Sequence, residues 1–292
     1  MIKKTAVIVA ALAMFLLASP AGAFSISPAG FRVTADPATT QIVRVKVKNN
    51  ESTVANFKFD VLGARQDEHG LPLFGSGFDM AEIWVRPEFE SLTLKPGEEK
   101  SVGFVIRVPP GIGPGGHYLG LAIKKMNGGT NSVTISGQLL AIMSLQVAGV
   151  ANESLKINRW VAGETTSWKK IWPMYLTLVN TSNVEVNLLA DAVIRNSAGK
   201  ELARLPLDIG PDNLISGAVR VAEPKLDLAG KKIWWPGKYL VQLEVQYGLT
   251  HQTAMAAAEI YYYPLWLIWP GTILILAILI SIFVWLHRRK IS

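Results

Sequence analysis

Apolar and polar residues alternate with a period of two along most of the chain between residues 24 and 262. Residues 43–48 show this clearly, because valines at 43, 45 and 47 alternate with three basic residues. Such alternation predicts a β-strand with one face in a core and the other in water. Similar segments at 57–61, 83–87, 102–108, 118–124 and 133–147 are separated by turns rich in Pro, Gly and Asn, with a polar loop expected at 66–77. Short strands at this spacing predict a β-sandwich over residues 24–150.

Residues 133–150 form an apolar stretch that could be mistaken for a membrane span. Ser136, Gln138, Ser144 and Gln146 interrupt it, and it has no cationic flanks. We therefore expect a strand pair, or one long strand bent at Gly137.

The second half of the chain repeats the plan of the first at an offset of about 120–130 residues. Three pairs of phrases match: Pro114-Gly115-Gly116-His117-Tyr118-Leu119 with Pro236-Gly237-Lys238-Tyr239-Leu240, Val47-x-Asn49-Asn50 with Leu178-x-Asn180-Thr181, and Leu94-x-Pro96-Gly97 with Ile209-x-Pro211-Asp212. The sequence thus predicts an all-β fold of two tandem immunoglobulin-like β-sandwiches, over residues 24–150 and 151–262.

The C-terminal stretch at residues 265–286 contains no charged side chain. At a helical rise of about 1.5 Å per residue it matches the roughly 30 Å of a bilayer's hydrocarbon core. It predicts a single transmembrane helix over residues 263–287. Arg288, Arg289 and Lys290 in the tail at 288–292 would then lie in the cytoplasm by the positive-inside rule. The alternative, a buried core helix, is disfavoured because so few residues follow.

The N-terminal residues 1–23 have the pattern of a signal peptide. Lys3 and Lys4 precede an apolar segment too short to span, and Ala21-Gly22-Ala23 matches a cleavage site. An uncleaved N-terminal anchor remains the alternative. In either case the body of the protein is exported, and a single C-terminal pass holds it in the cell membrane with its sandwiches on the extracytoplasmic side. With the signal peptide cleaved, the protein is single-pass.

Charge and cysteine content exclude several classes of function. Of 29 Lys and Arg, two lie in residues 1–23 and three in the tail, which leaves 24 against 22 acids. An excess of two charges gives no basis for a nucleic-acid surface. The chain has no cysteine, so disulfides, thiolate metal sites and thiol catalysis are impossible.

Motifs for catalysis or cofactor binding are weak, and we expect no enzyme, no cofactor and no metal. Gly111-x-Gly113-x-x-Gly116 fits the dinucleotide fingerprint, but an alternating segment follows it where that motif needs a helix. The four histidines are far apart, and His117 at the start of a predicted strand is expected to be a hydrogen-bonded structural residue. A hydrolase built from groups distant in sequence is the alternative that remains.

Two near-copies of a basic, tryptophan-rich phrase mark the second sandwich. The phrases are residues 168–172 and 231–235. If the second sandwich has seven antiparallel strands, both phrases lie in loops at the end of the sandwich where the last strand reaches Tyr261 and the membrane anchor. The loop at residues 196–200 lies at the same end. Trp favours the lipid headgroup region, and each nearby Lys adds about 1 kcal/mol against anionic lipid. Our hypothesis is that these residues contact the membrane: Trp168, Lys169, Lys170, Trp172, Lys231, Lys232, Trp234 and Trp235. The alternative is that the tryptophans are partly buried packing residues.

The whole arrangement resembles the bacterial WxL-interacting proteins and, more distantly, the pilus-chaperone sandwiches. The phrases Phe24-Ser25-Ile26-Ser27-Pro28, Leu94-Lys95-Pro96-Gly97-Glu98 and Pro114–Gly120 carry the first resemblance. It implies a first domain that engages peptidoglycan or surface proteins, and a second that engages a host or partner protein.

We expect a non-enzymatic envelope protein that presents two sandwiches to a surface-protein or cell-wall glycan partner. The turns near residues 49–54, 95–100 and 127–131 are its candidate binding surface, and a strand edge there could accept a partner strand. The alternative is an extracytoplasmic assembly chaperone for secreted subunits that acts by β-strand addition.

Overall fold

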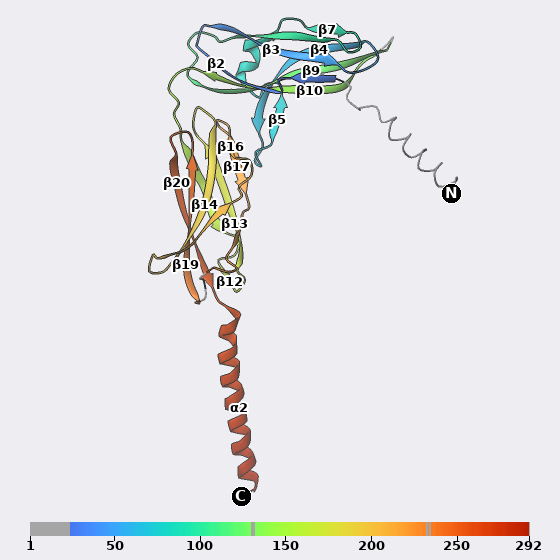
Figure 1. Cartoon of the computed structure of the whole chain (residues 1–292). Helices are drawn as coiled ribbons and strands as arrows, with labels where there is room; N and C mark the ends of the chain where they lie inside the picture. The colour runs from blue at the N-terminus through green and yellow to red at the C-terminus, as the bar shows by residue number, and fades with distance from the viewer. Residues whose placement is uncertain (1–23, 130–131, 232, 234, 292) are drawn as a thin grey trace, which may run out of the picture. The chain divides into compact units, whose positions relative to one another are not determined.

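The computed structural model describes residues 24–129, 132–231, 233 and 235–291, and it divides into two compact units. The first contains the residues up to Ala64 together with Phe74–Gly149. The second contains Arg65–Leu73 and the chain from Val150 onward, including the C-terminal helix (Figure 1). The expected signal peptide at residues 1–23 lies outside the described residues.

The first unit consists of two β-sheets. One has the order β1-β3-β8-β6, formed by Phe24–Ser27, Thr40–Asn49, Glu99–Arg107 and Val85–Pro87. The other has the order β2-β10-β9-β4-β5, formed by Gly30–Ala35, Ser132–Val147, Gly115–Gly129, Ala55–Gln66 and Pro72–Gly75, and β7 (Ser91–Leu94) pairs with β4. The start of the chain thus contributes to both sheets, because β1 pairs with β3 whereas β2 pairs in parallel with β10.

The alternating pattern decides which side chains form the core of this unit. Val45 and Val47 on β3 are fully buried, and Phe104 on β8 packs edge-on to Phe59 on β4, with ring centroids 6.3 Å apart. The other fully buried residues that β8, β9 and β10 contribute to this core are Val102, Ile106, Leu119, Leu121, Ile123, Ala141, Met143, Leu145 and Val147. Burying one large apolar side chain contributes about 1.5–3 kcal/mol, so the inward faces of the two sheets hold the sandwich together.

Two segments differ from the sequence expectation. Residues 66–77 are not all loop, because β4 continues to Gln66 and Pro72–Gly75 forms β5. Residues 83–87 are not all strand, because a 3-10 helix, η1 (Met80–Trp84), precedes β6. Asp79 caps this helix by accepting a hydrogen bond from the Ala81 N–H, a local contact that overrides the strand pattern.

The second unit repeats the strand order of the larger sheet of the first, and its smaller sheet is similar but lacks a counterpart of β6 among the described residues. Its sheets have the orders β11-β13-β17 and β12-β20-β19-β14-β15, with β18 pairing β13 and β16 pairing β14. The strands are β11 (Leu155–Ala162), β12 (Thr166–Ser167), β13 (Ile171–Asn180), β14 (Val186–Asn196), β15 (Glu201–Leu207), β16 (Asn213–Leu214), β17 (Val219–Ala222), β18 (Lys225–Asp227), β19 (Gly237–Tyr247) and β20 (Gln252–Tyr262). β12 pairs in parallel with β20, as β2 does with β10. The predicted fold of two tandem immunoglobulin-like sandwiches is confirmed.

Two buried asparagines show the internal repeat at atomic detail. Asn49 Nδ2 donates to the Thr53 and Leu94 carbonyls, and Asn180 Nδ2 donates to the Val184 and Leu214 carbonyls. In each case a glycine N–H, from Gly97 or Gly217, donates to the asparagine carbonyl. The counterpart of residues 94–97 is therefore 214–217, and the sequence match to residues 209–212 was wrong.

Arg220 on β17 is the largest buried charged side chain of the second unit. Its guanidinium donates to the carbonyls of Ile209, Pro211 and Asn213, while its Nε has no partner among the described residues. Burial lowers the pKa of Arg220, and the nearby Asp67 carboxylate opposes this shift.

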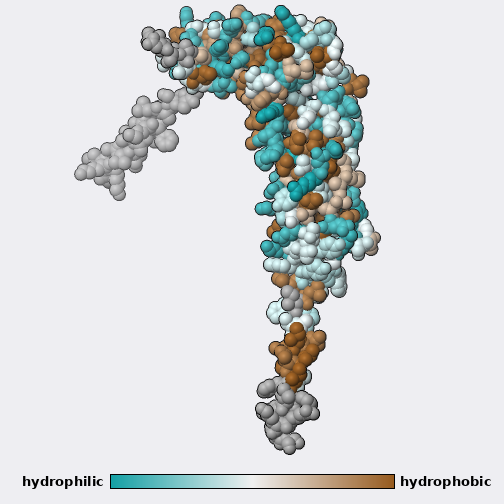
Figure 2. Space-filling model, turned by 180° about the vertical axis from the view of Figure 1, so that it is seen from behind, coloured by the Kyte–Doolittle hydropathy of each residue, from teal (hydrophilic) through white to brown (hydrophobic). Residues whose placement is uncertain are grey.

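The C-terminal segment continues from β20 through a 3-10 turn, η2 (Leu265–Leu267), into α2 (Ile268–Ile291). The helix starts five residues later than expected, because β20 extends to Tyr262 and Pro264 follows. Among the described residues this is the one helix long and apolar enough to cross a membrane. Its side chains from Trp269 to Ile282 are exposed, and Figure 2 shows a hydrophobic surface over its start.

Candidate functional site

Two surfaces of the described chain are candidate functional sites. The first is the outer edge of β10 from Thr134 to Ala141, called here the β10 edge. The second is a pocket beside the start of the C-terminal helix, called the anchor pocket.

The β10 edge is open because β2 pairs with only part of β10. β9 pairs with β10 along its length, whereas β2 pairs with Ile142–Val147 alone. Among the described residues, Thr134–Ala141 has no strand on the side opposite β9. The strand therefore offers unpaired backbone groups at this edge.

Backbone hydrogen bonding indicates which groups point outward. The Ile142 N–H donates to the Ala29 carbonyl at 2.9 Å, on the side where β2 lies. The N–H and C=O groups of successive residues in a strand point to opposite edges, so every second residue points to the same edge. The register with β9 is unbroken from Gly137 to Val147, so this alternation continues from Ile142 back to Gly137. The N–H and C=O groups of Leu140 and Gln138 therefore point to the open edge.

Side chains along the β10 edge are apolar or neutral. Ser132–Val147 contains no charged residue and no proline. Ile135 is 54% exposed, Leu139 37% and Ile142 46%. Lysine and proline commonly protect edge strands, and neither occurs here. A bulge between Ile135 and Gly137 interrupts the pairing with β9 and limits the regular part of the edge to residues 137–141.

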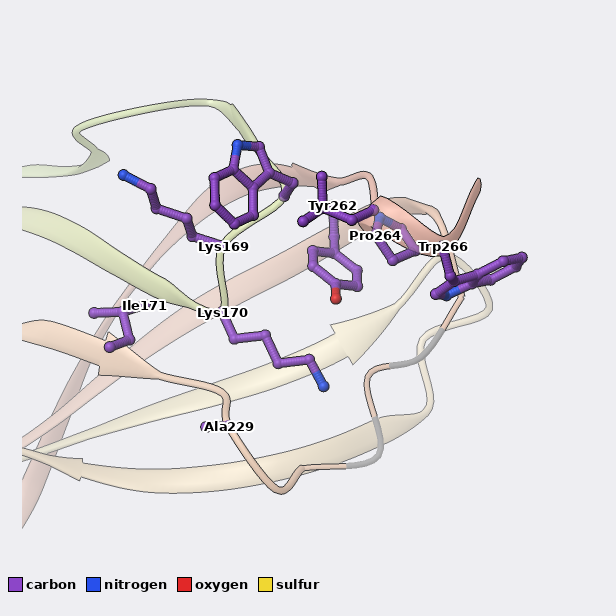
Figure 3. A pocket seen from close by; sticks show the side chains of 9 residues that line it. Lys169, Lys170, Ile171, Ala229, Tyr262, Pro264 and Trp266 are labelled. Carbon is purple, nitrogen blue, oxygen red and sulfur yellow. The ribbon is translucent and has the colours of Figure 1, made fainter. Parts of the chain in front are cut away.

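The anchor pocket is built from segments that hydrogen bonds tie to the end of β20. The Tyr261 and Tyr263 N–H groups donate to the carbonyls of Thr165 and Ser167, and the Leu228 N–H donates to the Lys170 carbonyl. These contacts bring two loops against residues 262–266. The resulting hollow has a volume of about 610 Å³ and is lined by Trp168, Lys169, Lys170, Ile171, Ala229, Tyr262, Pro264, Leu265 and Trp266 (Figure 3).

Three of the predicted membrane-contacting residues line this pocket, namely Trp168, Lys169 and Lys170. Trp168 is 53% exposed, and the Lys169 ammonium lies 5.7 Å from the centre of its indole ring. Trp235 is 73% exposed, and its ring stands edge-on to that of Trp266 with centroids 6.3 Å apart.

The prediction is wrong for Trp172. Its side chain is fully buried on β13, and its Nε1 has no partner among the described residues. Position 172 lies within a strand whose alternate residues face the core, whereas Trp168 lies in the loop before it. Lys231 is half-buried and does not line the pocket, and Lys232 and Trp234 lie outside the described residues.

The pocket also contains residues that the sequence reasoning missed. Tyr262, Pro264 and Ala229 line it, although none of them belongs to either tryptophan-rich phrase. For Tyr262 and Pro264, closeness in sequence to the predicted anchor was the available signal, and Ala229 had no such signal. The loop at residues 196–200 does lie at this end of the sheet, because Asn196 pairs with Tyr239, which pairs with Ile260.

The basic tail of Arg288, Arg289 and Lys290 continues α2, and its side chains are not among those described. The glycine-rich phrase at residues 111–116 leads into strand β9, as predicted, so no helix follows it to bind a pyrophosphate.

His117 has the structural role expected from the sequence. Its Nδ1 lies 2.8 Å from Asp79 Oδ1, and its ring stands edge-on to Trp84 at 4.7 Å. Burial opposes ionisation of Asp79, but hydrogen bonds from His117, Ala81 and Tyr118 outweigh it and hold the pKa of Asp79 below its usual range. The cluster joins η1 to β9 and faces no pocket described above.

No protein-family model matches the sequence. No curated protein matches it either. Solved structures similar to this chain include a chaperone–tip adhesin complex of CFA/I fimbriae biogenesis, with 12% identity, 83% of this chain and 100% of that chain covered, and a TM-score of 0.47. The class 5 fimbriae chaperone CfaA has 12% identity, the same coverage and a TM-score of 0.40.

The CsuC–CsuE chaperone–tip subunit complex of Csu pili from Acinetobacter baumannii is also similar. It has 11% identity, with 81% of this chain and 98% of that chain covered, and a TM-score of 0.40. At such identities and TM-scores these similarities carry no argument about function.

Proposed function

We propose that this protein is an extracytoplasmic assembly chaperone, tethered to the cell membrane by α2, that binds a secreted protein subunit by β-strand addition at the β10 edge. The subunit contributes one extended segment that pairs with residues 137–141. The helix keeps the protein at the membrane surface, with the basic tail in the cytoplasm and both sandwiches outside.

The exposure of Leu139 is the observation that carries this proposal. Leu139 lies on the same face of β10 as Ala141, Met143, Leu145 and Val147, which are all fully buried. Its exposed fraction is 37%, and the change occurs where the pairing with β2 ends. An added strand would restore both the missing hydrogen bonds and the missing apolar cover at this place.

Strand addition also accounts for the composition of the edge. Main-chain hydrogen bonds supply affinity without requiring a particular sequence, while alternate side chains of the partner supply specificity. Each net hydrogen bond contributes about 0.5–1.5 kcal/mol, so a strand that pairs over five residues binds usefully only if apolar contacts add to it. Leu139 and the outward-facing Ile142 provide apolar surface of this kind.

A photo-crosslinking amino acid at position 138 in intact cells tests the proposal. Gln138 is exposed, and its backbone faces the open edge. The expected result is a crosslinked adduct with one secreted protein. The matched control is position 58, because Lys58 is exposed on β4, which pairs with β7 and β9 on its two sides.

The identity and fate of the adduct decide among the functions considered. A subunit that crosslinks less when the light is applied later in a chase has left the protein, and this result supports assembly chaperoning. A folded surface protein or glycan complex that stays bound would support the scaffold role expected from the resemblance to WxL-interacting proteins. Equal crosslinking at positions 58 and 138, or none at either, would contradict binding at the β10 edge.

A further inference from the structure

We propose that the anchor pocket binds the headgroup and glycerol region of an anionic phospholipid from the leaflet in which the second unit is anchored. The inference rests on one part of the proposed function, the crossing of the membrane by α2. It is independent of what binds at the β10 edge.

The position of the pocket selects a lipid as its occupant. Leu265 and Trp266 are the first residues of the membrane-length apolar segment, and both line the pocket. If α2 crosses the bilayer, the pocket lies at the depth of the lipid headgroups. Aromatic side chains prefer this depth, and Trp168, Tyr262 and Trp266 all contribute to the wall.

The residues that line the pocket favour a ligand that carries a negative charge next to an apolar group. Lys169 and Lys170 supply two ammonium groups, and the other lining residues are apolar or aromatic. Figure 3 shows the two lysine side chains leaving neighbouring backbone positions in opposite directions, with that of Lys170 running toward the side of the view where Tyr262 lies. A phosphodiester can pair with the ammonium group of either lysine while the glycerol and the first acyl carbons contact Ile171, Pro264 and Leu265.

The pocket is held open by contacts within the unit. The parallel pairing of Thr166 and Ser167 with Tyr261 and Tyr262 fixes the loop that bears the lysines. The Lys169 N–H donates to Ser167 Oγ at 3.1 Å. Trp235 packs against Trp266 and so limits the positions open to that indole. A volume of about 610 Å³ is in the usual range for small-ligand pockets, about 300–1,000 Å³.

The test is native mass spectrometry of the full-length protein released from nanodiscs of phosphatidylcholine mixed with phosphatidylglycerol. The expected result is selective retention of phosphatidylglycerol. The double variant K169Q/K170Q should retain less, by about fivefold for each lysine removed. The matched control K48Q/K156Q removes the same charge from two exposed strand positions outside the pocket, and it should retain as much as the unmodified protein.

Two results would overturn the proposal. One is equal retention of phosphatidylglycerol by K169Q/K170Q and the unmodified protein. The other is retention of phosphatidylcholine at the same level as phosphatidylglycerol. Crosslinking at position 138 in the same variants separates the two proposals, because loss of the lipid site should leave the β10 adduct unchanged.

Discussion

Asp79 shows how one buried side chain can organise its surroundings. Its carboxylate accepts hydrogen bonds from the Ala81 N–H, the Tyr118 N–H and the His117 ring, each at 2.8 Å. The Asp79 and His117 side chains are only 11% and 14% exposed. One residue thus caps η1 and ties it to β9.

The lowered pKa of Asp79 predicts loss of stability in acid. The pKa of Asp79 is lower in the folded protein than its ordinary value of about 3.9, so the ionised carboxylate stabilises the fold. This stabilisation is fully present above about pH 4 to 5, and it disappears as the pH falls through the pKa of Asp79 in the folded protein. Asp79→Asn should lower the unfolding free energy of the first unit near neutral pH by about 1–3 kcal/mol. The difference from the unmodified protein should shrink as the pH falls.

Hydrogen exchange of the β8 and β9 amides, corrected for intrinsic rates at each pH, measures this effect. The exposed Asp36→Asn change is the control and should track the unmodified protein. A difference between Asp79→Asn and the unmodified protein that stays constant with pH would refute the assigned role of the carboxylate.

At the scale of secondary structure, β10 is the element on which the proposed function depends. The same strand is a core element over residues 141–147 and an edge over residues 134–141. The division arises because, of the first two strands, β1 pairs with β3 and only β2 pairs with β10.

A charge placed at Leu139 should abolish partner binding without unfolding the protein. In Leu139→Lys the partly exposed side chain can direct its ammonium to water, whereas an added strand would bury the charge unpaired. An unpaired buried charge costs several kcal/mol, so the subunit identified by crosslinking should no longer co-purify. Leu139→Met conserves volume and should bind as before. Normal binding by Leu139→Lys would show that this face stays open in the complex.

At the scale of the whole molecule, the two units share the strand order of their larger sheets but present different surfaces. The parallel pairing of β2 with β10 covers six residues, whereas that of β12 with β20 covers two. The chain after β12 instead forms the loop that lines the anchor pocket. One fold thus offers a strand edge in the first unit and a pocket in the second.

The absence of cysteine makes the predicted membrane orientation directly testable. Ser197 is exposed in the second unit, and Ser292 ends the chain. In intact cells a membrane-impermeant maleimide should label Ser197→Cys, while Ser292→Cys should react only after lysis. The cysteine-free parent supplies the background. Labelling of Ser292→Cys in intact cells would place the C-terminus outside.

Much of the fold could be predicted because it depends on local pattern. Alternation at residues 43–47 and 102–106 defined the inward faces of β3 and β8. The matching phrases at 114–119 and 236–240 do open equivalent strands, β9 and β19. The match of residues 94–97 to 209–212 failed, because the hydrogen bonds of Asn180, rather than the likeness of a proline turn, define the equivalent turn at 214–217.

The sequence by itself determined the period of the strands, the repeat of the sandwich and the apolar C-terminal helix, since each depends on residues close together in the chain. Tertiary structure alone decided which of two similar tryptophans is exposed. Trp168 lines a pocket and Trp172 is buried, because strand β13 begins between them. The tertiary structure also decided where β10 has a free edge. The free edge ends where β2, more than 100 residues earlier in the chain, begins to pair with β10.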